Sequence, residues 1–209
     1  MSNLTREKVE QAIGILEEQE IDLWLTFVRE TSANGDPVMP LIYGDADLTW
    51  QSALILTRTG ERIAIVGRFD AETARGIGAY ETVIGYDESL RQELLPILER
   101  LDPKRIALNY SADDVLADGL SHGLYQVLQG YLQDTPFANR ICSAEKAISA
   151  LRGRKTQGEI QRIKAAIETT LQIYHRTFAH VQPGMSEIEI GDFMQKQLEK
   201  FGVGPAWHA

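Results

Sequence analysis

The sequence has few of the features that mark secreted or membrane-spanning proteins. Its 209 residues include one cysteine, Cys142, so no disulfide can form within the chain, which fits a reducing compartment. No window approaches the roughly 20 consecutive apolar residues that cross a bilayer. Residues 1–8 are polar and lack the apolar stretch of a signal peptide. We therefore expect a cytoplasmic protein with no membrane partner.

Positive charge is also in short supply. Lys and Arg number 21 against 30 Asp and Glu, which gives a formal net charge of -9. An acidic chain repels phosphate backbones, so nucleic acid is not an expected partner. Hydrophobic residues make up 44% and charged residues 24%, which is ordinary for a globular protein with a sizeable core. The length allows one domain and part of a second.

Sequence motifs of catalysis are missing as well. There is no Gly-rich phosphate loop and no Gly-x-Ser-x-Gly nucleophile turn. His175 and His180 stand five residues apart in a predicted helix, whereas a helical metal pair needs a spacing of three or four. Cys142 is interpreted as a small buried hydrophobe, because nothing around it resembles an activating base. The residues therefore assign no catalytic, substrate-binding or metal-binding position.

Two pairs of aspartates receive a local interpretation. Asp45 and Asp47 precede Trp50 in a loop, where Asp side chains commonly accept hydrogen bonds from their own backbone. Asp113 and Asp114 are expected to cap the helix that follows them. Both pairs are therefore predicted to stabilise turns and helix ends.

Helices and strands alternate through the first three quarters of the chain. Short runs rich in branched and aromatic residues predict strands, and apolar residues three and four apart predict helices. The turn at Gly60 joins two strands in a hairpin, whereas the other strands are joined by crossovers. This pattern predicts an α/β domain with a mixed sheet over residues 1–150, which is expected to fold by itself. The predicted strands are 23–28, 53–57, 62–66, 82–84, 105–108 and a short one at Ile141; the predicted helices are a first one capped by Thr5, 70–80, 90–101 with a kink or a late start at Pro96, 120–132 and one that Ser143 opens; residues 31–47 form a long loop.

Two long helices follow a basic, glycine-containing segment at 151–155, which we interpret as a linker. Thr156 and Ser186 each begin a capping box, and Gly202 ends the second helix. Both helices are amphipathic, so each needs a partner surface. We expect a second copy of the chain to cover this hairpin, or else a mobile hairpin. Its apolar stripe comprises Ile160, Ile163, Ile167, Leu171, Tyr174, Phe178 and Val181, with Ile190, Phe193, Met194, Leu198 and Phe201 on the second helix.

The order of these features resembles the Xaa-Pro aminopeptidase/prolidase family of creatinase-like metallopeptidases. In the hairpin the resemblance rests on Leu151–Arg152, Lys155, Glu159–Ile160, Ala165–Ala166, 183–187 and Phe201–Gly202. In the first 148 residues it rests on Tyr43–Gly44, Trp50, the strand–turn–strand at 53–66, 109–111, 117–120 and His122–Gly123.

The resemblance implies a creatinase/prolidase N-terminal-type domain over residues 1–150. Residues 151–209 would then be a linker and an αα-hairpin that begins an incomplete pita-bread catalytic domain. The family holds two divalent cations (manganese, cobalt or zinc) with two Asp, one His and two Glu, and cleaves the peptide bond before proline. All five ligands follow the second helix of that domain, so no ligand is assigned to this chain; His208 lies too early. Trp207 is expected in the core of the catalytic sheet or beside its pocket.

Three functions follow from these expectations. The first is a part of a metal-dependent Xaa-Pro peptidase that shapes the substrate pocket and holds a homodimer together, without peptidase activity of its own. The second is a creatinase-like C–N hydrolase with the same fold and no metal. The third is a non-enzymatic interaction module.

Overall fold

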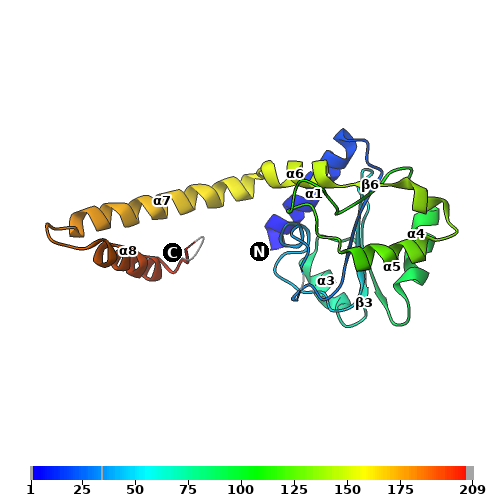
Figure 1. The fold of residues 1–209 in the computed structure, drawn as a ribbon, viewed down its shortest axis with the longest axis horizontal. Coiled ribbons are helices and arrows are strands. Elements are labelled where there is room, and N and C mark those ends of the chain that lie inside the picture. Colours follow the sequence, from blue (N-terminus) through cyan, green and yellow to red (C-terminus); the bar gives the residue numbers. More distant parts are fainter. Residues whose placement is uncertain (1, 34, 206–209) are drawn as a thin grey trace. The chain divides into compact units, whose positions relative to one another are not determined.

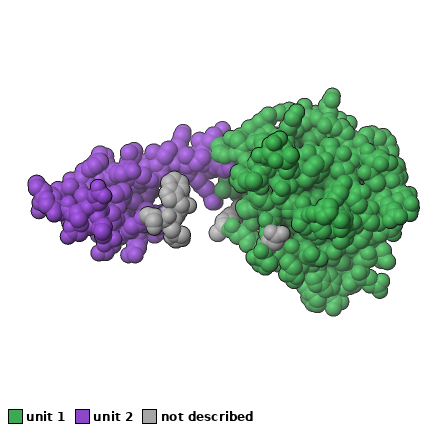
Figure 2. Space-filling view, viewed as in Figure 1, with its two compact units in different colours: residues 1–156 green, residues 157–209 purple. Residues whose placement is uncertain are grey.

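The computed structural model describes residues 2–33 and 35–205. The chain divides into two compact units, residues 1–156 and 157–209 (Figure 2). The first unit is an α/β domain and the second is a helical hairpin (Figure 1).

A six-stranded mixed sheet forms the centre of the first unit, with the strand order β4-β3-β2-β1-β5-β6. β2 pairs antiparallel with both β1 and β3, and the other neighbouring strands are parallel. The predicted hairpin is the β2–β3 pair, and Gly60 in its turn has φ +102°, which favours glycine. The strands are β1 (Leu23–Val28), β2 (Ser52–Thr57), β3 (Arg62–Gly67), β4 (Thr82–Tyr86), β5 (Ile106–Leu108) and β6 (Ile141–Ser143).

Both faces of the sheet are covered by helices, which explains why its central strands are apolar throughout. Side chains alternate across the pleat, so Trp24 points to one face and Leu25 and Phe27 to the other. The Trp24 face packs against α1 (Ser2–Glu18), α2 (Met39–Ile42), α3 (Ala71–Ile77) and α6 (Glu145–Gly153). The opposite face packs against α4 (Leu90–Leu101) and α5 (His122–Leu132) (Figure 1).

Some local structure differs from the prediction. The loop at 31–47 contains the short helix α2, which Pro40 helps to start because its missing N–H needs no partner in a first turn. A 3-10 turn, η1 (Pro136–Arg140), lies between α5 and β6. α4 begins at Leu90 and continues through Pro96, so the helix does not start late.

The predicted cap at Asp113 and Asp114 is wrong. Asp114 Oδ1 accepts from the backbone N–H of Leu116 at 2.9 Å and closes a turn. α5 begins later, where Ser121 Oγ accepts from the N–H of Leu124 at 3.3 Å. The backbone N–H of Leu120 still donates to Asn109 O at 2.8 Å, so the chain cannot enter a helix before Ser121.

The boundary between the two units lies after residue 156, C-terminal to the predicted linker at 151–155. Leu151 is fully buried in the core as part of α6, so the first residues of the segment 151–155 belong to the domain. Lys8, on α1, is 2% exposed. Its Nζ donates to Leu151 O and Arg154 O, both at 2.7 Å, and to Gln11 Oε1 at 3.0 Å. The buried ammonium group of Lys8 therefore caps the C-terminal end of α6 by donating to its last carbonyl groups.

The second unit is made of α7 (Gln157–His180) and α8 (Glu187–Phe201). The capping box predicted at Ser186 is present, and Gly202 ends α8 with φ 63°. The two helices touch through His180, whose ring stacks on Phe193 at 3.8 Å between centroids, and through Arg176, which lies over Phe201 at 4.6 Å. The box predicted at Thr156 stays a prediction.

Much of the apolar stripe of α7 lies in solvent. Phe178 is 72% exposed and Ile167 53%, whereas Ile173 and Thr177 are buried. Exposed apolar surfaces of this kind commonly mark interaction sites. The exposed members, which we call the α7 stripe, are Ile163, Ile167, Leu171, Tyr174, Phe178 and Val181.

Replacement of Lys8 by Met should lower the free energy of unfolding by about 2–4 kcal/mol, because hydrogen bonds from a charged donor to buried carbonyls are lost. Urea unfolding of the full chain measures this change. Lys146→Met, an exposed substitution on α6, serves as the control and should change stability by less than about 0.5 kcal/mol. Equal effects of the two substitutions would contradict the capping role of Lys8.

Candidate functional site

The carboxyl ends of β1 and β5 are the natural place to look for a site. From β1 the chain continues to β2, which lies on one side of β1 in the sheet. β5 lies on the other side of β1 and leads through α5 to β6, farther out on that side. The order of strands therefore reverses between β1 and β5. In α/β sheets, ligands bind outside the carboxyl ends of the strands at such a reversal. Residues 29–51 and 109–121 form the two loops that leave this point.

A buried polar network occupies the reversal point. Asn109 Oδ1 accepts from Trp24 Nε1 at 2.6 Å, and Asn109 Nδ2 donates to Asp36 Oδ2 at 2.7 Å and to Thr26 Oγ1 at 3.2 Å. Asp36 Oδ1 accepts from the N–H of Val38 at 2.9 Å. These side chains join the sheet to both loops.

Gly119 is required by this packing. A Cβ atom at position 119 would lie 2.0 Å from Cγ of Asp36, so any other residue would displace the carboxylate. Gly119 lies in the stretch 117–120 on which the family resemblance rests, but no local pattern in the sequence explains why glycine stands there. The reason is the close approach of the two loops. The bond between them joins Asn109 to Asp36, which are 73 residues apart in the chain, so no local sequence pattern reveals it.

Burial raises the pKa of the Asp36 carboxyl above its ordinary value of 3.8, and the Asp118 carboxylate raises it further. The N–H of Val38 and the amide of Asn109 act in the opposite direction but do not cancel the effect of burial. Asp36 is 2% exposed, so its role is to hold the two loops together.

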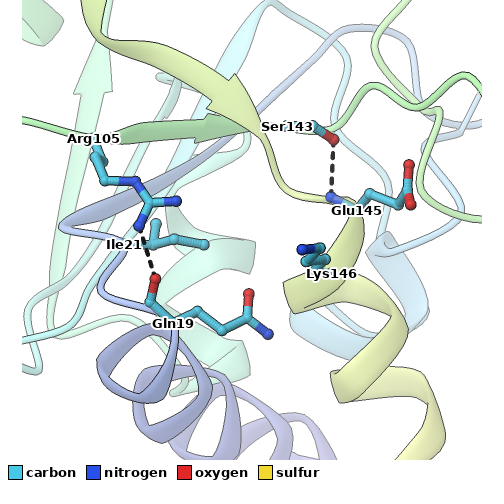
Figure 3. Close-up of a pocket in the computed structure, with 6 residues that line it drawn as sticks. All are labelled: Gln19, Ile21, Arg105, Ser143, Glu145 and Lys146. Atoms are coloured by element: carbon cyan, nitrogen blue, oxygen red, sulfur yellow. Dashed lines mark hydrogen bonds between the residues drawn. The ribbon is translucent and has the colours of Figure 1, made fainter.

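A hollow of about 450 Å³ lies beside the edge strand β6 (Figure 3). Arg105 is the main cation in it, but Arg105 Nη1 donates to Gln19 O at 2.9 Å and to Glu20 O at 3.1 Å, at the end of α1. Ser143 Oγ accepts from the N–H of Glu145 at 3.1 Å. These polar groups therefore serve the fold, and no nucleophile lies beside a base among the lining residues, which are Gln19, Ile21, Arg105, Ser143, Glu145 and Lys146.

Cys142 lies on β6 and is half-buried. Burial raises the pKa of its thiol, while the nearby guanidinium of Arg105 lowers it without reversing the shift. A thiol that stays protonated near neutral pH is a poor nucleophile. The interpretation of Cys142 as a packing residue fits these surroundings.

A second hollow, of about 400 Å³, lies against the loop at 31–47. Asp47 Oδ1 there accepts from Thr31 Oγ1 at 3.1 Å, and Thr31 Oγ1 accepts from the N–H of Leu48 at 2.8 Å. Asp47 thus stabilises its own loop through the hydroxyl of Thr31, whereas the prediction was a bond from its own backbone. Asp45 also lines this hollow, and together with Asp36 it gives the hollow an acidic lining.

Within residues 2–33 and 35–205, no group of three or more His, Cys, Asp and Glu side chains could hold a metal ion. The part of the chain that is described therefore does not fit the two-metal centre that the resemblance implies. His180 contacts Phe193 on α8 and does not pair with His175. Trp207 and His208 lie outside the described residues. No described helix has the length and hydropathy that spanning a bilayer requires.

Comparison with known proteins places this fold. No protein-family model and no curated protein matches the sequence. Among solved structures, the Xaa-Pro dipeptidase from Bacillus anthracis matches with a TM-score of 0.59 and 16% identity over 94% of this chain and 49% of that chain. The X-Pro aminopeptidase from Thermotoga maritima MSB8 matches with a TM-score of 0.58 and 23% identity over 93% of this chain and 49% of that one.

A shorter solved chain matches over most of its own length. The proline dipeptidase structure from Streptococcus pneumoniae matches with a TM-score of 0.50 and 19% identity, over 70% of this chain and 98% of that chain. At these identities the likeness establishes the fold. The chain therefore shares the fold of these Xaa-Pro peptidase structures, with an α/β first unit, and it spans about half the length of the Xaa-Pro peptidases from Bacillus and Thermotoga.

Replacement of Asp36 by Asn should lower the free energy of unfolding by about 1–3 kcal/mol, because an amide cannot accept from both Val38 and Asn109. The loss should depend on pH. The folded-state pKa of Asp36 is raised, so its contribution is complete below the unfolded value near 3.8 and declines as pH rises to the folded value. The stability advantage of the natural chain over Asp36→Asn should therefore be largest in acid.

Urea unfolding of both proteins across this pH window measures the difference. Asp87→Asn is the control, because Asp87 is an exposed partner of Arg68 on the surface. An advantage that grows as pH rises would contradict the assignment of a raised pKa to Asp36.

Proposed function

We propose that this chain is the first half of a metal-dependent Xaa-Pro peptidase, which cleaves the peptide bond before proline. The observation that carries the proposal is the extent of the structural match. It includes more than nine tenths of this chain, hence the α7–α8 hairpin as well as the α/β domain, and about half of each longer neighbour. The α/β domain shapes and closes the substrate pocket, and the hairpin begins the catalytic domain.

The α7 stripe supports this division of labour. Full burial of one large apolar side chain contributes about 1.5–3 kcal/mol to stability. Six such side chains left in solvent therefore lose an amount of free energy comparable to the free energy of unfolding of an ordinary domain. Packing of α8 on α7 leaves these six exposed. In the proposed enzyme the rest of the catalytic domain covers the stripe. In the 209-residue chain by itself a second copy covers it and gives a dimer.

The chemistry of the proposed enzyme belongs to residues outside the described part of this chain. Two divalent cations, manganese, cobalt or zinc, would polarise the peptide carbonyl and supply a hydroxide nucleophile. The described side chains provide no ligand set for these ions. Their part is to enclose a peptide substrate and to hold the subunits together. We also propose a cytoplasmic location.

The product of the complete gene should hydrolyse Xaa-Pro dipeptides in the presence of manganese or cobalt, and a chelator should abolish the activity. The 209-residue chain by itself should show neither turnover nor tight binding of two ions. Hydrolysis assays and calorimetric titration with manganese measure both. Turnover by the 209-residue chain, or a complete product that cleaves creatine-like C–N bonds without metal, would contradict the proposal.

Replacement of Phe178 by Asp should weaken self-association of the 209-residue chain by about tenfold, because a charge in an apolar interface is poorly compensated. Sedimentation at micromolar concentrations measures the dimer. Glu187→Asp, an exposed change at the start of α8, is the control. A natural chain that sediments as a compact monomer, with helices that resist protease, would show that the stripe has no partner copy.

A further inference from the structure

A third hollow lies at the carboxyl end of β5. Its volume is about 430 Å³. Two tyrosines and a leucine supply apolar walls, and an aspartate and a histidine supply polar groups. Burial raises the pKa of Tyr110, and Cys142 and Tyr125 raise it further, so this wall stays uncharged near neutral pH. We call this hollow the Tyr110 pocket; it is lined by Tyr110, Asp118, Leu120, His122 and Tyr125.

The neighbouring loop holds two aliphatic side chains in solvent. Val115 is 79% exposed and Leu116 is 43% exposed, and Tyr110 at the pocket is itself 37% exposed. Elsewhere in the same loop Ala117 is completely buried. The loop therefore sinks one small side chain into the core and presents two larger ones outward beside an aromatic hollow.

Hydrogen bonds fix this loop in place. Ser111 Oγ accepts from the N–H groups of Asp113 at 3.0 Å and Asp114 at 2.8 Å. Asp114 Oδ2 accepts from Ser149 Oγ at 2.9 Å, which ties the loop to α6. Asp118 Oδ1 accepts from the N–H of Ser111 at 3.2 Å. A loop that is already ordered loses little conformational entropy when a partner binds.

Carboxylates stand around this apolar surface. Asp113 and Asp118 are exposed on the loop, and the chain as a whole carries a formal net charge of -9. Two copies that met through this surface would bring like charges together, which opposes association. A cationic side chain, by contrast, would meet the Asp118 carboxylate and two tyrosines, and both carboxylates and aromatic rings attract cations.

We propose that the Tyr110 pocket and the Val115–Leu116 loop tip together form a docking site for a positively charged amphipathic segment of a partner protein. An aliphatic side chain of the segment packs on Val115 and Leu116, and a neighbouring Lys or Arg enters the pocket between the tyrosines and Asp118. The partner is recognised by alternation of apolar and basic residues. This inference does not depend on the peptidase activity.

A fluorescently labelled Leu-Arg-Leu-Arg peptide tests the proposal. Fluorescence polarisation with the full 209-residue chain in about 0.15 M salt, where long-range attraction is screened, should show saturable binding. Peptides with Ser in place of Leu, or Glu in place of Arg, should bind about tenfold more weakly, because each lacks one of the two contacts. Val115→Ser should weaken binding of the Leu-Arg peptide about tenfold.

Asp118→Asn separates local from general charge. The amide keeps the acceptor for the N–H of Ser111, so the loop is preserved, and binding should weaken about threefold. Asp134→Asn, at the other end of α5, removes the same charge away from the pocket and should leave binding unchanged. Circular dichroism confirms that each variant is folded.

Three results would overturn the proposal. The first is no binding of the Leu-Arg peptide. The second is that Asp118→Asn and Asp134→Asn weaken binding of the Leu-Arg peptide equally, or that the Ser-Arg peptide binds as tightly as the Leu-Arg peptide. Either outcome means that the peptide is attracted by net charge alone. The third is a natural chain that self-associates and loses this association with Val115→Ser, which would assign the loop tip to a second copy.

Discussion

The buried ammonium group of Lys8 joins the first helix of the chain to the last helix of the α/β unit. Because Lys8 Nζ donates to the carbonyls of Leu151 and Arg154, α6 lies beside α1 on the Trp24 face of the sheet. Without α6 that face would lose Ala147, Ile148 and Leu151 from its core. The sheet is apolar on both faces and is stable when both are covered. The contact therefore decides where the first unit ends, and with it where the hairpin begins.

Local patterns were sufficient to predict most of the secondary structure. The six-residue apolar run at 23–28 is β1, the turn at Gly60 forms the β2–β3 hairpin, and the capping box at Ser186 starts α8. Each of these signals lies within a few residues of the element it specifies, and tertiary packing agrees with it. The mixed sheet followed from the same pattern, but the antiparallel pairing of β1 with β2 did not, because one hairpin among crossovers predicts only the β2–β3 pair to be antiparallel.

Long-range contacts were the part that local patterns could not supply. The bond from Asn109 to Asp36 spans 73 residues, and neither residue type by itself predicts a buried pair. Gly153 and its basic neighbours resembled a linker, yet Leu151 two residues earlier is in the core. Asp113 and Asp114 were assigned to a helix cap because Asp is common there. The competing bond from Leu120 to Asn109 O delays that helix to Ser121.

Two surfaces of the chain remain exposed and carry the functional account. The α7 stripe is a long apolar face without a sheet to cover. The Val115–Leu116 loop tip is small and ordered, and carboxylate side chains surround it. Hydrogen exchange of α7 amides in the 209-residue chain and in the complete gene product tests the central claim most directly. Slow opening requires a buried helix face, so the account predicts fast exchange in the 209-residue chain under monomeric conditions and slow exchange in the complete product. Equal protection in both would contradict it.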